Sequence, residues 1–152
     1  MNKILNFAKI DAQLKISCRA ISIIVLSVIL PIILIPIIKF TGHSEVVEEI
    51  AKVLVVLFLI LKLPTLKLQI FGGISFGLFF GLSENIFYLN NIFQGGDLNV
   101  FWQRFLWTIP MHIITILLIL FSTKFGKKFI FVGFAVALIL HILFNSFILS
   151  FL

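Results

Sequence analysis

Long apolar segments separated by short charged ones constrain this chain more than any other feature of its sequence. Hydrophobic residues make up 61% of the 152 residues, and charged residues only 12%. Soluble domains carry about 25% charged residues, so this composition excludes an ordinary soluble domain. A helix of about 20 apolar residues can cross the hydrocarbon core of a bilayer. The sequence therefore predicts an all-α, polytopic integral membrane protein.

Turn signals divide the apolar sequence into five predicted membrane-spanning helices, at residues 20–40, 45–63, 66–89, 101–121 and 129–152. Pro31 and Pro36 are expected to kink the first helix, and Pro64 is expected to end the second. Residues 1–19 are predicted to form a basic, amphipathic lead-in at the cytoplasmic interface. Residues 20–152 are predicted to form a single transmembrane domain.

The third predicted helix carries a stripe of small residues. Gly73, Gly77 and Gly81 recur at intervals of four residues, which places them on one helix face. Small residues in such a stripe let a neighbouring helix approach closely. After this helix we expect a polar loop on the outer side of the membrane, at residues 90–99.

The basic residues set the predicted orientation. Most of them fall in segments assigned to the inner side: Lys3, Lys9, Lys15, Arg19, Lys62, Lys67, Lys124, Lys127 and Lys128. Lys39 and Arg104 lie at the outer edge. Cytoplasmic segments carry an excess of Lys and Arg, so the N-terminus is predicted inside and the C-terminus outside a plasma membrane. Because the positive charges follow this rule, the net charge of +6 gives no reason to expect nucleic acid as a partner.

An acidic cluster opens the second predicted helix. Three carboxylates and an ammonium lie at helical spacing on one face there, those of Glu45, Glu48, Glu49 and Lys52, and only the apolar run 53–61 follows them. That run is too short to cross the bilayer alone, so a spanning helix must carry the carboxylates below the membrane surface. Ionisable groups at that depth normally face a protein interior or a wet cavity and mark a functional site. The alternative is a solvated first helical turn, where Glu is favoured.

Polar residues of four predicted helices fall at a similar depth. Counting about 1.5 Å per residue from the nearest inner basic residue puts four of them roughly 18 to 26 Å from the inner face: Glu48, Glu84, His112 and His141. In a core about 30 Å thick, all of these lie in the outer half, so we expect them to meet in one polar site. Taken singly, His112 is more often an interior histidine, and His141 with Asn145 is also typical of polar contacts between helices.

These residues form an ordered set of motifs. A paired glutamate followed by a basic residue comes first, then a Gly- and Phe-rich helix ending in Glu-Asn, an arginine followed by a histidine, and finally His-x-x-x-Asn. The residues concerned are Glu48, Glu49, Lys52, Glu84, Asn85, Arg104, His112, His141 and Asn145. Over residues 45–145 this order resembles the PrsW-type intramembrane proteases, a group related to the CAAX-processing glutamic membrane endopeptidases.

The resemblance implies an endopeptidase that hydrolyses a peptide bond of a membrane-anchored protein near the outer leaflet. The implied base that activates water is Glu48, with Glu49 as the other candidate. Glu49 would otherwise pair with Lys52 or Arg104.

The other motif residues have implied supporting roles. His112 would share the water or donate to the tetrahedral intermediate, and His141 with Asn145 would stabilise the oxyanion. Glu84 and Asn85 would complete the polar site, binding water or orienting a histidine.

The resemblance implies a glutamic mechanism with no cofactor. Two histidines with one or two carboxylates are also typical of a zinc site that keeps a position open for water, so zinc-dependent proteolysis is the alternative. The expected partners are the lipid bilayer and a membrane protein substrate, with anti-sigma factors as the class that family members cleave. A second copy of the chain or an accessory membrane subunit is a further candidate.

Two other classes of protein would use similar residues. A transporter or proton relay also places Glu and His near the middle of the membrane, although such folds usually show internal repeats and more helices. A membrane scaffold without activity would keep the helices but has no need for the full set of motifs.

Overall fold

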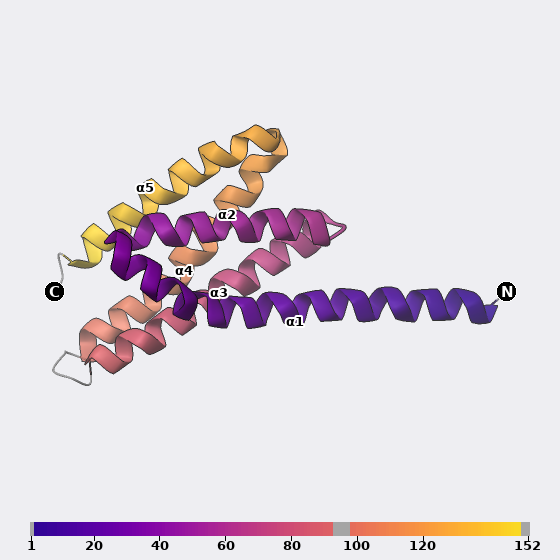
Figure 1. Cartoon of the computed structure of the whole chain (residues 1–152), viewed down its shortest axis with the longest axis horizontal. Coiled ribbons are helices and arrows are strands. Elements are labelled where there is room, and N and C mark those ends of the chain that lie inside the picture. The colour runs from indigo at the N-terminus through magenta and orange to yellow at the C-terminus, as the bar shows by residue number, and fades with distance from the viewer. Residues whose placement is uncertain (1, 93–97, 150–152) are drawn as a thin grey trace.

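The computed structural model describes residues 2–92 and 98–149, and this part of the chain is helical with no strand (Figure 1). Its α-helices are α1 (Asn2–Thr41), α2 (Ser44–Lys62), α3 (Leu66–Ile92), α4 (Leu98–Ser122) and α5 (Ile130–Leu149). Two short 3₁₀ turns, η1 (Thr123–Phe125) and η2 (Lys127–Phe129), join α4 to α5. The predicted all-α class is confirmed. Of the predicted loop at 90–99, residues 93–97 lie outside the described residues, and its two ends belong to α3 and α4.

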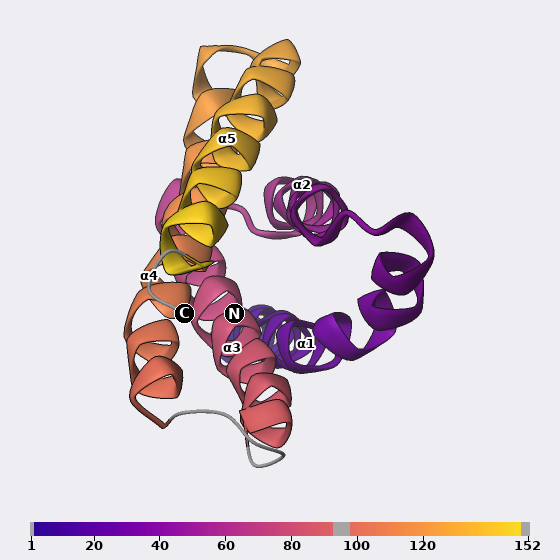
Figure 2. The same ribbon diagram turned by 90° about the vertical axis from the view of Figure 1, so that its left-hand side faces the viewer.

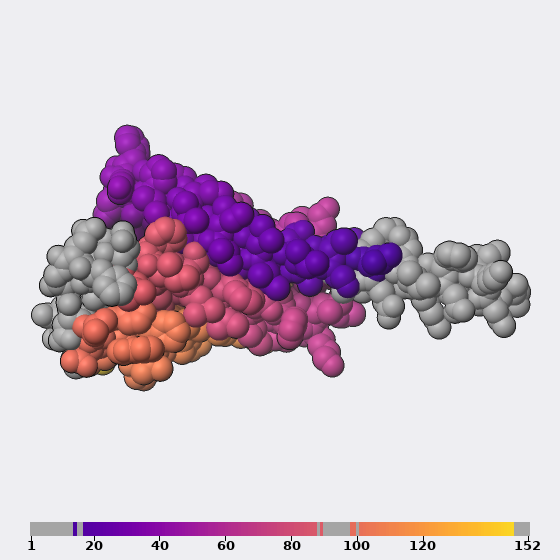
Figure 3. Space-filling view, turned by 90° about the horizontal axis from the view of Figure 1, so that it is seen from below, coloured from indigo at the N-terminus to yellow at the C-terminus, as the bar shows by residue number. Residues whose placement is uncertain are grey.

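The helices form one bundle in which α3 and α4 are central. α3 packs against α4 and α1, α4 packs against α5, and α2 contacts α1, α3, α4 and α5. Figure 2 shows the C-terminal part of α1 curving round from α3 to α2, so that these two helices flank it. In Figure 3 the side chains of α1 lie along those of α3 over much of the visible face.

Among the described residues, four segments are long and apolar enough to cross a membrane: Ser17–Thr41, Leu66–Phe87, Phe101–Phe125 and Lys127–Phe147. α2 is a helix of 19 residues, but it carries too many charged side chains to qualify by composition. The bundle buries the charged side chains of Glu48, Glu49 and Lys52. That α2 also spans stays a prediction. The predicted orientation depends on it, because four spans would leave both termini on one side.

α1 is a continuous helix of 40 residues. No proline or glycine occurs before Pro31, so nothing in the local sequence interrupts the helix at residue 19. The helix is about 60 Å long at 1.5 Å per residue, roughly twice the hydrocarbon thickness. The division into a lead-in and a transmembrane domain stays a prediction. Figure 1 shows the purple part of α1, which holds Pro31 and Pro36, turning away from the axis of the indigo part, as the prolines predict.

A glycine turn precedes α2, and side chains fix the C-terminal end of this helix. The turn that precedes it contains Gly42 in a left-handed conformation (φ 73°), which costs glycine little strain. At the other end, the Arg19 guanidinium donates to the carbonyl oxygen of Lys62 at 2.5 Å, and the Gln69 amide donates to that of Leu63 at 3.0 Å. These bonds satisfy backbone carbonyls that have no hydrogen-bond partner within the helix. They also hold α2 in place, and with it the charged face of this helix.

The glycine stripe of α3 packs closely against a neighbouring helix, as the sequence predicts, and the structure identifies that helix as α4. A Cβ atom at Gly77 would lie 2.7 Å from Ile113 Cα, and one at Gly81 would lie 3.1 Å from Ile109 Cα. At Gly73 the nearest atom would be a side-chain carbon of Leu117, at 3.4 Å. Backbone therefore approaches backbone most closely at Gly77, one to two turns from the polar residues of α3.

We expect Gly77→Ala to destabilise the bundle by about 1–3 kcal/mol, the usual cost of overpacking. The added methyl group would meet backbone atoms of Ile113, which cannot turn aside as a side chain can. Gly73→Ala is the matched control on the same stripe and should change stability much less. The free energy of unfolding in detergent, measured by denaturant titration, checks both values. Equal losses in the two variants would contradict the assigned close approach at Gly77.

Candidate active site

α2 turns its charged face into the bundle. The side chains of Glu49 and Lys52 are 0% exposed, and Glu48 is 7% exposed. The Lys52 ammonium donates to Glu49 Oε1 at 2.5 Å and to Thr115 Oγ1 of α4 at 2.8 Å. Helix phase alone slightly favours a pairing of Lys52 with Glu48, four residues earlier, but the structure pairs it with Glu49. Buried charges are tolerated when they are paired and hydrogen-bonded in this way.

His141 of α5 connects the two α2 carboxylates. Its Nδ1 lies 2.8 Å from Glu49 Oε1, and its Nε2 lies 3.9 Å from Glu48 Oε2. A carboxylate paired with Lys52 can only accept hydrogen bonds, so the proton between Glu49 and the ring belongs to Nδ1. The hydrogen bond at Nδ1 fixes the orientation of the His141 ring, and the Nε2 edge of the ring then faces Glu48.

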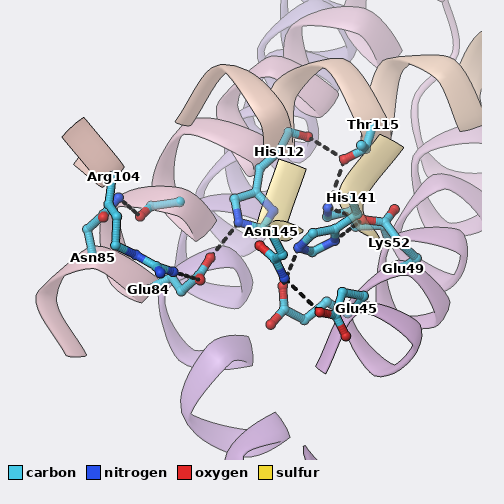
Figure 4. A network of polar contacts seen from close by, with 12 residues as sticks. Glu45, Glu49, Lys52, Glu84, Asn85, Arg104, His112, Thr115, His141 and Asn145 are labelled. Carbon is cyan, nitrogen blue, oxygen red and sulfur yellow. Dashed lines mark hydrogen bonds and ion pairs between the residues drawn. The ribbon is translucent and has the colours of Figure 1, made fainter. Parts of the chain in front are cut away.

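Glu84 of α3 holds the second histidine. His112 Nε2 and Glu84 Oε2 are 2.5 Å apart, and the Arg104 guanidinium lies 3.9 Å from Glu84 Oε1. Arg104 therefore contacts Glu84 rather than Glu49. The rings of His112 and His141 meet edge to face, with centroids 5.6 Å apart. Figure 4 shows the two histidines side by side, one reaching Glu84 and the other Glu49.

Besides Thr115, the network includes Glu45, which is not among the predicted site residues. Asn145 Nδ2 donates to Glu45 Oε1 at 2.8 Å, so a third α2 carboxylate takes part. The only sequence signal is periodic, since Glu45 precedes Glu49 by one turn and Asn145 follows His141 by one turn. Asn85, by contrast, donates to the carbonyl of Gly81 in its own helix and reaches none of the other site residues through that amide.

A cavity of about 520 Å³ opens beside these groups. On one side it is lined by polar residues of four helices: Glu48, Glu84, Arg104, His141 and Asn145. On the other it is lined by one face of α1: Pro31, Leu34, Ile35, Ile38 and Lys39. Glu49 and Lys52 are fully buried and are not among its lining residues. The predicted meeting of Glu48, Glu84, His112 and His141 is thus observed, with Glu48 rather than Glu49 facing the cavity.

Three of these side chains could hold a metal ion. Donor atoms of Glu48, Glu84 and His112 all lie within 4.8 Å of one another. Glu48 Oε2 is buried and has no hydrogen-bond partner among the described residues. Zinc takes imidazole and carboxylate ligands at about 2.0–2.2 Å, so donor atoms in a tetrahedral site lie roughly 3.4 Å apart. The residue types therefore fit a zinc site, although the side chains would have to shift to share one ion.

Ionisable side chains around a cavity inside a helical membrane bundle mark a functional site, and carboxylates with histidines are groups that can activate water in a hydrolase. The sequence pattern of a family described as PrsW family intramembrane metalloprotease matches residues 21–152 of this chain. Since the match covers most of the chain, the chain belongs to this family and is an intramembrane protease. No curated protein and no solved structure shows significant similarity to it.

Proposed function

We propose that this chain is an endopeptidase in which Glu48 activates water to hydrolyse a peptide bond of a membrane-anchored protein. The observation that carries the proposal is the different setting of the two adjacent glutamates. Glu48 lines the cavity, where water and a substrate carbonyl can reach it. Glu49 is enclosed, with one oxygen accepting from both Lys52 and His141. We therefore assign the base to Glu48 and a supporting role to Glu49.

Hydrolysis follows a balanced sequence of proton transfers. The Glu48 carboxylate takes a proton from water as the water oxygen forms a bond to the carbonyl carbon. The carbonyl π electrons move to its oxygen, which gives a tetrahedral oxyanion. When the carbon–nitrogen bond breaks, the proton on Glu48 passes to the leaving nitrogen. The products are an amine and a carboxylic acid, and Glu48 is again ionised.

The developing oxyanion needs hydrogen-bond donors at the same cavity wall. The Asn145 amide has two N–H groups, and Glu45 accepts only one of the bonds they can make. We propose that the second N–H donates to the oxyanion. His141 can add a donor at Nε2 only as the imidazolium, because its Nδ1 proton already serves Glu49. His112 is held by Glu84, and one of its ring nitrogens lies within 4.8 Å of carboxylate oxygens of Glu48 and Glu84.

A second candidate chemistry is zinc-dependent hydrolysis, favoured by the donor set and by the family's description as metalloproteases. Glu48, Glu84 and His112 would hold the ion. A bound zinc ion supplies a Lewis acid and lowers the pKa of its water. In that case Glu48 would serve as a ligand, and the direct contact between His112 and Glu84 would have to open.

The cavity walls fit a membrane-anchored substrate. Four residues of α1 give part of the cavity wall an apolar surface: Pro31, Leu34, Ile35 and Ile38. Lys39 and Ser44, which flank the turn between α1 and α2, also line the cavity. Because that turn is predicted on the outer side, we propose cleavage near the outer leaflet of the plasma membrane, with the N-terminus of the enzyme inside.

For the substrate class we propose anti-sigma factors and similar single-span regulators, on the strength of the family relationship. Assembly with a second copy or with an accessory membrane subunit is part of the same proposal. Nucleic acid has no place in it.

The proposal is tested by reconstitution of the purified protein with a panel of single-span reporter proteins that differ in their outer juxtamembrane segments. We expect at least one reporter to be cut into two fragments near the outer leaflet. Dialysis of the enzyme against a chelator should leave the rate of reporter cleavage unchanged. Loss of activity on chelation and its recovery with zinc would replace the glutamic mechanism by the zinc-dependent one. No cleavage of any reporter, with the enzyme correctly folded, would count against peptidase activity.

A further inference from the structure

Thr115 of α4 lies beside the buried ion pair but belongs to none of the sequence motifs. Its side chain is buried, and the residue is 1% exposed. The hydroxyl oxygen accepts a hydrogen bond from the Lys52 ammonium at 2.8 Å. The same hydroxyl donates to the carbonyl oxygen of His112, one turn earlier in α4, at 3.3 Å. Thr115 therefore links the backbone of α4 at His112 to the Lys52 ammonium of α2.

Lys52 is connected through Glu49 to the other histidine, His141. Its ammonium donates to Glu49 Oε1, and the same oxygen atom accepts from Nδ1 of His141. The ring of Phe80 lies on another side of the ammonium, 6.0 Å from it. A hydrogen-bonded chain thus runs from Thr115 through Lys52 and Glu49 to His141 (Figure 4). At its end, the Nε2 edge of His141 faces Glu48 across 3.9 Å.

We propose that Thr115 is a positioning residue for the peptidase site. Its hydroxyl holds the Lys52 ammonium against Glu49 Oε1, and Glu49 thereby fixes the tautomer and the orientation of the His141 ring. The inference rests on the proposed function, since it assigns His141 to the reacting side of the cavity. At metal sites, loss of a partner one step removed from the reacting groups typically costs roughly 10- to 100-fold in activity, and we expect a loss of that order here.

The same helix offers a matched control. Thr108 lies two turns before Thr115 in α4 and is 2% exposed. Its hydroxyl has no hydrogen-bond partner among the described residues. Replacing either threonine by valine keeps the shape and removes the hydroxyl. Only at Thr115 does the change remove a bond to Lys52.

The kinetic test compares Thr115→Val, Thr115→Ser and Thr108→Val in liposomes, with a reporter that the wild type cuts. We expect Thr115→Val to lower kcat roughly tenfold with little change in KM, because the bound substrate does not touch Thr115. Thr115→Ser should restore kcat, and Thr108→Val should match the wild type. Equal kcat values for Thr115→Val and Thr108→Val would overturn the proposal. If Thr115→Val does not insert, Thr115→Cys, which keeps a weak acceptor, should still lower kcat.

A second readout does not depend on activity. The ¹⁵N resonances of the His141 ring, assigned by their loss in His141→Gln, report which nitrogen carries the proton and how it is hydrogen-bonded. We expect a signal from protonated Nδ1 in the wild type and in Thr108→Val, and a shifted signal in Thr115→Val. An unchanged His141 spectrum in Thr115→Val would contradict the chain even if activity fell. A shifted spectrum without cleavage by the wild type would support the chain and refute the peptidase function.

Discussion

A Glu48→Gln variant is expected to fold and insert normally and to lose peptidase activity by roughly 10³-fold, within the usual range for removal of a general base. Glutamine has nearly the same size as glutamate and can fill the same place in the cavity wall. It cannot accept a proton from water at neutral pH. The initial rate of reporter cleavage in liposomes, at equal amounts of folded enzyme, measures the effect.

Glu45→Gln provides the control for this variant. The two glutamates belong to neighbouring turns of α2, but Glu45 accepts a hydrogen bond from Asn145, which a glutamine oxygen can also accept. We expect Glu45→Gln to keep most of the activity. If Glu48→Gln cut the reporter at a rate close to that of the wild type, Glu48 would not be the base. If Glu49→Gln alone abolished cleavage without loss of stability, the roles of the two glutamates would have to be exchanged.

The largest stability effect is expected at Lys52. Lys52→Met leaves Glu49 as a carboxylate in a buried position without its cation, and removal of one partner of a buried ion pair typically costs about 3–5 kcal/mol. Methionine is similar in length and apolar, so loss of packing should contribute little. The free energy of unfolding in detergent, measured for the variant and the wild type, gives the value.

Two further variants separate the ion pair from other causes. Lys62→Met changes an exposed lysine at the end of the same helix and should alter stability by less than about 0.5 kcal/mol. Lys52→Met combined with Glu49→Gln removes both charges and should recover most of the lost stability. A loss below about 1 kcal/mol for Lys52→Met alone would contradict the buried pair. Absence of recovery in the double variant would assign the loss to packing.

Much of the fold could be predicted because the length of an apolar segment and the position of a helix-breaking residue can be read directly from the sequence. The apolar segments, Pro64 and the basic turn at Lys124 locate α2, α3, α4 and α5 within a few residues of where the structure has them. The sequence also predicts the end of α1, but not its start, because the helix begins at Asn2 and not near residue 20. The glycine stripe correctly predicts a close helix neighbour. It does not say which one, because the partner α4 is identified only by tertiary packing.

The composition of the site could be predicted better than its pairings. Depth counting brings Glu48, Glu84, His112 and His141 to one layer, and the structure places them in contact range of one another. Helical spacing puts Lys52 within reach of either neighbouring glutamate, so the sequence could not decide between them. That choice depends on helix rotation, which is fixed by packing against α4 and α5.

Two contributions to the site had no usable sequence signal. Thr115 is one threonine among several in apolar surroundings. What distinguishes it is its hydrogen bond with Lys52, which is known only from the structure. The α1 wall of the cavity follows from the bend of that helix, which carries Leu34 and Lys39 over the polar residues. A proline predicts that a helix bends, whereas the direction of the bend depends on the neighbouring helices.

Mapping of new protein termini in cell membranes shows whether Glu48 drives proteolysis of a membrane protein. Cells that express the wild type are compared with cells that express Glu48→Gln at equal levels. We expect a new terminus near the outer end of a membrane-spanning segment that is present only with the wild type. Identical sets of termini in the two strains, with both proteins inserted and folded, would contradict this expectation.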